Sequence, residues 1–174
     1  MEYIVFVNEN GQPTGQVGEK LASHNSATKL HLAFSCYIFN NDGKVLVTRR
    51  ADNKKVWPSV WTNSVCGHPS PGETFENAIQ RRSTHELGLA ITDIKIRLPT
   101  YRYQTPLFNG VIENEFCPVF FARTGDEPNP NPDEVSTYEW ITWDELVRRT
   151  NTNTQAVWSW WCKDQVPKLH NLLL

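Results

Sequence analysis

The sequence predicts a layered domain of the α/β or α+β class, with mixed β-sheets flanked by helices. Short apolar runs of strand length recur along the 174 residues, and helical patterns stand between them at irregular spacing. A hydrophobic content of 39% is enough to build a core, and this chain length is typical of one domain. We therefore expect a single domain over residues 1–174.

Runs rich in apolar, β-branched and aromatic residues predict the strands. In chain order they are Tyr3–Val7, Leu32–Phe39, Lys44–Arg50, Val60–Cys66, Ile94–Tyr103, Val111–Phe121 and Tyr138–Ile141. Asn40-Asn41-Asp42-Gly43 favours a hairpin between the second and third of these runs. Polar or turn-forming residues predict loops at Ala51–Ser59 and Pro106–Gly110. Three prolines make Arg123–Asp133 an expected exposed connection.

The clearest helix is predicted over Phe75–Leu87. Thr74 is a good N-cap residue, and Gly88 stands just past the end, where glycine accepts a left-handed backbone. Two further helical segments are expected near the C-terminal end. They are Trp143–Arg149 and Ala156–Leu174. Pro167 should interrupt the second because proline lacks the backbone N–H that a helix needs.

Charge and hydropathy exclude several kinds of partner. The formal net charge is −2, so the chain has no general attraction for nucleic acid or an anionic membrane, and any anion site must be local. The N-terminal region lacks the basic and apolar parts of a signal peptide, and no run approaches the ~20 apolar residues of a membrane helix. The four cysteines form no C-x-x-C pair, which favours reduced thiols. We expect a cytoplasmic protein without a nucleic-acid or membrane partner.

Two carboxylates in the apolar run Val111–Phe121 suggest a metal site. Glu113 and Glu115 are two residues apart, so on a strand they face the same side and repel each other. A divalent ion between them would remove the repulsion. The alternative is an edge strand whose carboxylates face water, which is the commoner situation for charged residues.

Histidines elsewhere in the chain could complete such a site. His31 and His68 stand at the ends of predicted strands, and His24 lies in a polar segment before His31. Imidazoles with two carboxylates form a mixed nitrogen and oxygen set that suits Zn, Mn or Fe-like metals and is tolerable for Mg. Each histidine alone is more often a surface or hydrogen-bonded core residue. The five residues form no contiguous motif.

A thiol and several bases are further candidates for chemistry. Cys66 is two residues before His68, so an extended chain would point both the same way, and a thiol beside a metal can have a lowered pKa. A buried, inert cysteine is the commoner alternative. Four basic residues come from separate segments, and only the fold could bring them to one anion. They are Lys20, Arg50, Lys54 and Arg82. Each alone would be a solvated surface charge.

The region after Gly67 resembles the Nudix box, G-x5-E-x7-R-E-U-x-E-E-x-G-U, in which U is bulky and apolar. Gly67, Glu73, Arg81, Glu86, Gly88 and Leu89 match its spacing. Arg82, Ser83 and His85 replace a glutamate, an apolar residue and a second glutamate of the box. Nudix hydrolases use those glutamates to hold metals that activate water, so the resemblance implies a Nudix-type fold that has lost much of its hydrolytic equipment.

Further motifs resemble the type 1 isopentenyl diphosphate isomerases of the Nudix superfamily. They are TKLHLAF at 28–34, LVTRRA at 46–51, WTNSVCGHP at 61–69 and ENEFCPVF at 113–120. The resemblance spans about Gly11 to Trp161. It implies an isomerase of isoprenoid biosynthesis that interconverts isopentenyl and dimethylallyl diphosphate. It implies a prenyl diphosphate as the small-molecule substrate and leaves the oligomeric state open, with a monomer as one option.

The resemblance also implies a role for each candidate residue. His24, His31, His68, Glu113 and Glu115 would bind one divalent metal, Mn²⁺, Mg²⁺ or Zn²⁺. Cys66 and Glu115 would transfer protons, with Tyr103 hydrogen-bonded near Glu115. Lys20, Arg50, Lys54 and Arg82 would hold the diphosphate, and Glu86 would help to bind a second Mg²⁺ that arrives with it. Trp161 would cover the hydrocarbon, although its neighbours Trp158 and Trp160 leave the register open.

This chemistry accounts for the departures from the hydrolase box. The reaction adds a proton to an alkene and removes another, so it activates no water. Arg82 exchanges a metal ligand for a phosphate clamp. An ordinary thiol, with a pKa of roughly 8.5, is a poor acid for an alkene. We therefore expect Glu115, with Tyr103, to deliver the proton at carbon 4, and Cys66 to accept one from carbon 2 on the opposite face.

Two other functions are compatible with parts of the sequence. A Nudix pyrophosphohydrolase acting on a nucleotide or prenyl diphosphate would share the fold, but the missing glutamates at positions 82 and 85 oppose it. A non-catalytic binding module with a structural metal would need neither proton-transfer group. The presence of both Cys66 and Glu115 opposes that alternative.

Overall fold

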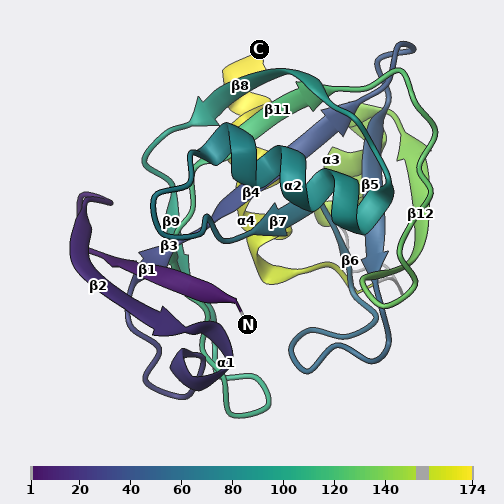
Figure 1. Ribbon diagram of the computed structural model, residues 1–174. Coiled ribbons are helices and arrows are strands. Elements are labelled where there is room, and N and C mark those ends of the chain that lie inside the picture. The colour runs from purple at the N-terminus through teal and green to yellow at the C-terminus, as the bar shows by residue number, and fades with distance from the viewer. Residues whose placement is uncertain (1, 152–156, 174) are drawn as a thin grey trace.

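The computed structural model describes residues 2–151 and 157–173, which form two β-sheets with helices around them (Figure 1). The strands are β1 (Tyr3–Val7), β2 (Pro13–Glu19), β3 (His31–Leu32), β4 (Phe34–Phe39), β5 (Val45–Arg50), β6 (Trp61–Thr62), β7 (Val65–Gly67), β8 (Thr92–Leu98), β9 (Arg102–Gln104), β10 (Asn114–Phe116), β11 (Val119–Arg123) and β12 (Val135–Ile141). The helices are α1 (Lys20–Ser23), α2 (Phe75–Leu87), α3 (Trp143–Asn151) and α4 (Trp160–Leu173). The mixed α+β architecture confirms the predicted fold class.

The strands divide into a five-stranded and a seven-stranded sheet. The first has the order β2-β1-β3-β10-β9. The second has the order β12-β5-β4-β11-β8, with β6 paired to β5 and β7 paired to β4. Both sheets are mixed, because β3 with β10 and β4 with β11 are parallel pairs among antiparallel neighbours. The predicted hairpin is present, with Phe39 opposite Val45 across β4 and β5.

Three of the predicted strands are wrong as continuous elements, because each passes from one sheet to the other. Leu32–Phe39 separates into β3 and β4, Ile94–Tyr103 into β8 and β9, and Val111–Phe121 into β10 and β11. At the last crossing Pro118 has no N–H to donate, which suits a break in pairing. The crossings lie side by side, since the Ala33 amide donates to the Phe116 carbonyl at 2.9 Å.

The predicted strand Val60–Cys66 is also two strands. Between β6 and β7 the side chain of Ser64 accepts a hydrogen bond from the Ile38 amide at 2.7 Å and donates to the Leu46 carbonyl at 2.6 Å. At Ser64, hydrogen bonds of the side chain therefore replace the backbone hydrogen bonds of the sheet. The strand before it, β6, pairs with β5, and the strand after it, β7, pairs with β4. This step positions Cys66, which follows immediately in β7.

The seven-stranded sheet has a core on each face. Along β4, Phe34, Cys36 and Ile38 face the apolar side of α2, whereas Tyr37 faces α3 and α4, as period-two alternation requires. Figure 1 shows α2 across the front of this sheet, with α4 behind it. Burial on both faces explains why this run is apolar at nearly every position.

Helix α2 has the predicted bounds, Phe75–Leu87. The Thr74 side chain caps its first turn by accepting a hydrogen bond from the Asn77 amide at 3.2 Å. Gly88 ends it in a left-handed conformation, with φ of 66°. The helix therefore holds Arg82 and Glu86, which are four residues apart, at fixed positions on one side of α2.

The predicted interruption of the C-terminal helix at Pro167 is wrong. Helix α4 continues through Pro167 as far as Leu173. The missing N–H costs one helical hydrogen bond, but the fully buried neighbours Val166 and Leu169 pack this helix against the sheet. Ala156 and Leu174, the ends of the predicted segment, lie outside the described residues. Across residues 2–151 and 157–173, the helices are all too short or too polar to span a bilayer.

The N-terminal strand β2 and helix α1 were not predicted. The residues of β2 are mostly exposed, and α1 has a single turn without a buried side chain. Neither segment has the apolar periodicity that would identify it from sequence. Both are held by pairing: Ile4 in β1 lies opposite Gly18 in β2, and the Lys20 amide donates to the Glu2 carbonyl at 2.9 Å.

Replacing Gly88 with alanine is expected to lower the free energy of unfolding by more than the same change at Gly43. Both glycines have φ near 70°, where a Cβ costs about 1–2 kcal/mol. A Cβ at Gly88 would also stand 3.0 Å from the Asn129 carbonyl oxygen, whereas the space around Gly43 is open. Urea unfolding followed by tryptophan fluorescence measures both, and equal losses would contradict the close contact at Gly88.

Candidate active site

A cavity of about 790 Å³ opens between the two sheets, α2 and the loop after β5. Nearly all the residues selected from the sequence line it. They are Lys20, His24, Arg50, Lys54, Cys66, His68, Arg82, Glu86, Tyr103, Glu113, Glu115 and Trp161. His31 lies behind this lining and is fully buried. The fold thus brings segments more than a hundred residues apart to one place.

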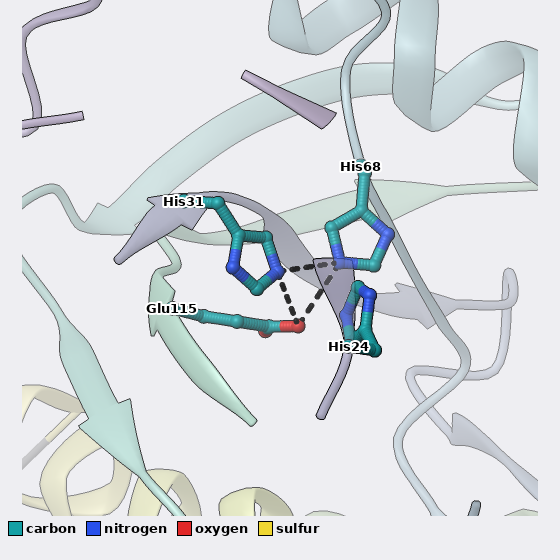
Figure 2. Close-up of side chains that lie close together, drawn as sticks. All are labelled: His24, His31, His68 and Glu115. Carbon is teal, nitrogen blue, oxygen red and sulfur yellow. Dashed lines mark hydrogen bonds and ion pairs between the residues drawn. The ribbon is translucent and has the colours of Figure 1, made fainter. Parts of the chain in front are cut away.

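Three imidazoles and a carboxylate converge on one side of the cavity (Figure 2). Nε2 of His31 and Nε2 of His68 are 3.2 Å apart, and Glu115 Oε1 lies 3.1 Å from His68 Nε2 and 3.7 Å from His31 Nε2. The ligand atoms of all four residues, including His24, lie within 4.8 Å of one another. Backbone pairing sets part of this geometry, because Glu115 in β10 is opposite His31 in β3.

These atoms have the arrangement of metal ligands. Nδ1 of His24 lies 2.7 Å from the Lys20 carbonyl, and Nδ1 of His31 lies 2.9 Å from the Lys29 carbonyl. An Nδ1–H that donates to a carbonyl leaves Nε2 with a free lone pair, as is usual for metal-binding histidines. Ligand atoms held about 2.1 Å from a common ion stand roughly 3.0–3.4 Å apart, as the His31–His68 and His68–Glu115 pairs do at 3.2 and 3.1 Å, while the His31–Glu115 pair is wider at 3.7 Å.

Glu113 joins this cluster through His24. Its Oε2 lies 3.3 Å from His24 Nε2, an ion-pair distance, but neither of these buried atoms has a hydrogen bond. Buried polar atoms without partners are rare in folded proteins, and a cation between them would satisfy both. Glu113 and Glu115 both reach the cavity, as the period-two argument predicted.

Burial and neighbouring charges keep His68 and Glu115 in their metal-binding forms, whereas the adjacent Glu113 carboxylate raises the pKa of His24 against the effect of burial. Burial, helped by the charge of Lys20, lowers the pKa of His68 to about 3, which leaves a neutral imidazole. Burial alone would raise the pKa of Glu115, but the adjacent imidazoles of His31 and His68 hold that pKa well below its usual range. Neutral imidazole and ionised carboxylate are the states that bind divalent ions.

Cys66 lies beside this cluster, at the wall of the cavity. Its thiol donates to Asn63 Oδ1 at 3.0 Å, and its sulfur lies 3.5 Å from Ser35 Oγ. Burial raises the pKa of Cys66 to about 12, the opposite direction to the lowered pKa that a neighbouring metal would give. The thiol is therefore protonated, while the carboxylate of Glu115 across the site is ionised.

Tyr103 and Trp161 form the aromatic part of the wall. The Tyr103 hydroxyl donates to Glu115 Oε2 at 2.7 Å, from a position opposite Glu115 in the β9–β10 pair. The ring of Trp161 lies 6.1 Å from that of Tyr103. Of the three tryptophans near the start of α4, Trp161 lines the cavity, Trp160 stacks on Tyr103, and Trp158 packs against Trp61 in β6. The structure therefore settles the register that the sequence left open.

Acidic residues hold three of the four bases that line the cavity. Lys20 Nζ lies 2.7 Å from Glu2, and Lys54 pairs with Glu134. The Arg82 guanidinium contacts Glu86 at 2.7 Å, Glu2 at 3.2 Å and Glu134 at 3.3 Å. Burial raises the pKa of Glu86 against the opposing charge of Arg82.

Arg50 differs from the other three bases in its partners. Its Nε donates to the Trp57 carbonyl at 2.9 Å, its Nη2 donates to the Val56 carbonyl at 3.0 Å, and its guanidinium lies 6.0 Å from the Trp161 ring centre. Carbonyl partners fix the side chain without neutralising its charge. Arg50 is therefore a positive group already held at the junction of the polar and aromatic parts of the cavity.

Sequence reasoning missed several residues of the site. Glu2 and Glu134 flank the bases, but they stand in segments with no motif or periodicity. Asn63 had a weak signal inside the WTNSVCGHP stretch. Its Oδ1 accepts hydrogen bonds from Cys66 and from the Trp161 indole, at 3.0 and 3.1 Å. Asn63 thus ties the thiol to the aromatic wall.

Comparisons with known proteins show that the sequence is similar to one domain family and to individual enzymes. Residues 29–162 match the family model of the NUDIX domain. An isopentenyl-diphosphate Delta-isomerase of Saccharopolyspora erythraea is 47% identical over 172 residues, covering 99% of this chain and 88% of its own length. One of Klebsiella pneumoniae is 53% identical over 140 residues, covering 80% of this chain and 76% of its own.

Solved structures share the architecture at lower identity. A crystal structure of a Deinococcus radiodurans protein superposes with a TM-score of 0.73 and 22% identity, covering 97% of this chain and 99% of that one. At such identity the likeness concerns the fold alone.

Proposed function

The chain belongs to the isopentenyl-diphosphate Delta-isomerases of the Nudix family, and we propose that it works by two proton transfers inside the cavity described above. The enzyme interconverts isopentenyl diphosphate and dimethylallyl diphosphate, a step of isoprenoid biosynthesis. One proton is added and another removed, so no bond to phosphorus is broken and no water molecule is consumed. The observation that carries the proposal is that two proton-exchanging groups, Cys66 and Glu115, line one cavity together with a cluster of bases.

We assign Glu115, with Tyr103, to carbon 4 of the substrate and Cys66 to carbon 2. With the proton on Cys66 and the carboxylate ionised, the pair is in the state that follows the reaction from isopentenyl diphosphate, in which Glu115 gives a proton to carbon 4 and the Cys66 thiolate takes one from carbon 2. From dimethylallyl diphosphate the Cys66 thiol gives its proton to carbon 2, and the ionised Glu115 takes one from carbon 4. One pair of groups serves both directions because a reversible reaction retraces its path.

The metal site is proposed to comprise His24, His31, His68, Glu113 and Glu115, holding one Mn²⁺, Mg²⁺ or Zn²⁺. When bound, such an ion supplies positive charge beside the carboxyl group that exchanges the proton. Support comes from the free Nε2 atoms and from the unpartnered atoms of His24 and Glu113. The Tyr103 hydroxyl holds the other oxygen of Glu115 and so fixes the direction in which this carboxyl faces the cavity.

The diphosphate is proposed to lie among Lys20, Arg50, Lys54 and Arg82. Phosphate oxygens suit the planar donors of arginine and the point charge of lysine. Glu2 forms ion pairs with Lys20 and Arg82, and its side chain is half-exposed. A diphosphate can therefore displace the Glu2 carboxylate into solvent more easily than a buried partner. Glu86 is proposed to help hold the Mg²⁺ that accompanies the diphosphate, since its carboxylate lies on the cavity side of α2.

The hydrocarbon end is proposed to face Trp161 and Tyr103. Protonation of the alkene creates a tertiary carbocation, which water would quench. Aromatic rings exclude water and attract the cation by about 2 kcal/mol when desolvated. Because that is small against the cost of forming a carbocation, the ionised groups around the cavity must contribute more.

A pyrophosphohydrolase, the alternative left open by the sequence, is not favoured by the site. Arg82 stands at a position where the Nudix box has a glutamate. Its guanidinium forms an ion pair with Glu86. His85, in place of a second glutamate, is half-exposed and lies 3.5 Å from Glu134. Among the carboxylates of a hydrolytic cluster, only Glu86 remains.

The decisive experiment follows isopentenyl diphosphate by proton NMR in the presence of Mg²⁺ and the purified protein. We expect the signals of dimethylallyl diphosphate to appear, while the phosphorus signals stay those of an intact diphosphate. A parallel assay for released phosphate across nucleotide and prenyl diphosphates tests the alternative. Phosphate release without allylic product would overturn the assignment.

Replacing His24 with alanine is expected to weaken binding of Mn²⁺ or Zn²⁺ by roughly 100-fold or more, because a metal ligand is removed. His24 is a suitable target, since it follows the single-turn α1 and supports no core. Titration of the metal-free protein by calorimetry measures the change. His170, on α4 away from the cavity, provides the control in His170→Ala. Equal affinities of the two variants would argue against the proposed site.

A further inference from the structure

A chain of buried polar side chains extends from Cys66 into the core behind it. The sulfur lies 3.5 Å from Ser35 Oγ, Ser35 Oγ accepts from Gln165 Nε2 at 3.0 Å, and Gln165 Oε1 accepts from the Tyr37 hydroxyl at 3.0 Å. Ser35, Gln165 and Tyr37 are all at most 1% exposed. Buried polar groups are costly unless every member is satisfied, and this network joins β4 to the C-terminal helix α4.

The directions of these hydrogen bonds determine what Ser35 can do. Its oxygen already accepts a hydrogen from Gln165, so its own hydrogen is available for a second partner. The proton of Cys66 points elsewhere, to Asn63 Oδ1. Asn63 cannot turn away, because its amide nitrogen donates to the carbonyls of Cys36 and Val65 at 3.0 and 2.9 Å. The sulfur therefore has an acceptor on one side and a donor on the other.

Ser35 has two sulfur neighbours at the same distance. Cys117 Sγ lies 3.5 Å from its oxygen, as Cys66 Sγ does. Cys117 is 1% exposed and away from the cavity lining, whereas Cys66 lines the cavity. A hydroxyl hydrogen turns towards the sulfur that carries more negative charge, and only the sulfur that exchanges a proton with substrate gains such charge during the reaction.

We propose that Ser35, held in place by Gln165 of α4, is a positioning residue that donates a hydrogen bond to the Cys66 sulfur while that sulfur is without its proton. The inference rests on the proposed role of Cys66. It adds to the site a residue from β4 and one from α4 that touch neither substrate nor metal. It also gives the C-terminal helix a part in the chemistry beyond packing.

The test compares Ser35→Ala and Gln165→Met, in the metal-loaded enzyme, by NMR kinetics. We expect Ser35→Ala to lower kcat roughly 10- to 100-fold, the usual effect of losing a hydrogen bond to a charged group, while KM stays within about twofold. Gln165→Met should have a smaller effect in the same direction, because Ser35 keeps its hydroxyl but loses its anchor. Ser35→Thr, which keeps the hydroxyl, should recover most of the rate.

A matched control separates this role from general loss of stability. Thr124 is also a buried hydroxyl, and it donates to the Ala90 carbonyl at 2.8 Å away from the cavity. Thr124→Val should lower the melting temperature with kcat unchanged. If Ser35→Ala changed only stability, as Thr124→Val does, the inference would be wrong. Should Ser35→Ala fail to fold, an unchanged kcat in Gln165→Met would be equally damaging.

The proposed function and this inference fail in different ways. If Cys66→Ala kept its activity, the role of Cys66 itself would be lost. If Cys66→Ala were inactive while Ser35→Ala and Gln165→Met kept the parent kcat, only the hydrogen bond from Ser35 would be refuted.

Discussion

Cys66→Ala is expected to reduce kcat by about 1000-fold or more, with little change in KM. The side chain removed is the one proposed to exchange a proton with carbon 2, and general acid or base catalysis contributes typically 10²- to 10⁴-fold. Binding should persist, because the bases around the diphosphate are untouched. Exchange of the carbon 2 hydrogen with deuterated water, followed by NMR, isolates the step that Cys66 performs. A variant that exchanged this hydrogen at the parent rate would remove Cys66 from the reaction.

Cys36→Ala is the matched control for this experiment. Cys36 is fully buried, one β4–β7 pair away from Cys66, but it faces α2 rather than the cavity. Its truncation should cost stability through a small cavity and leave kcat unchanged. The pair therefore distinguishes the loss of a thiol from the loss of the thiol that faces substrate.

Glu115→Gln is expected to abolish activity to a similar degree, and excess metal should not restore it. Glutamine keeps the size of the side chain and an oxygen that can bind metal, but it cannot carry the exchanged proton. The Tyr103 hydroxyl would still have an acceptor, so the local structure should survive. Isomerisation measured over a series of Mn²⁺ or Mg²⁺ concentrations checks both statements.

Glu113→Gln separates the two roles assigned to Glu115. Glu113 reaches the site through His24, and the Tyr103 hydroxyl donates to Glu115 and not to Glu113, so Glu113 is proposed to bind metal without transferring a proton. Its substitution should raise the metal concentration needed for activity and leave the maximal rate within about tenfold of the parent. Equal behaviour of the two glutamine variants would mean that Glu115 acts only as a ligand.

Local sequence signals predicted much of the fold because they reflect local energetics. The α2 bounds follow from a capping threonine and a glycine that accepts φ of 66°, and the β4–β5 hairpin follows from an Asp-Gly turn between apolar runs. The predictions were wrong where the structure of a segment depends on a neighbouring strand that is far away in the sequence. The breaks at Ala33 and Pro118 occur because neighbouring strands leave one sheet together and enter the other.

The helix through Pro167 shows the same effect in energetic terms. Proline removes one hydrogen bond, which is a local cost, but Val166 and Leu169 bury their side chains against the sheet, which is a larger tertiary gain. The strand β2 had no apolar pattern of its own and exists because β1 supplies its backbone partners. Neither outcome can be read from a short window of residues.

The chemical identity of the site is what the sequence by itself determined. The residue types of His24, Cys66, His68, Glu113 and Glu115 suggested a metal site beside a thiol, and the resemblance of their motifs to the type 1 isopentenyl diphosphate isomerases implied the reaction. Only the tertiary structure decided the geometry: which tryptophan faces the cavity, which carboxylates hold the bases, and which residues support the thiol. Those facts depend on contacts between segments far apart in the sequence, among them β4, β7 and α4, whose side chains meet only when the chain has folded.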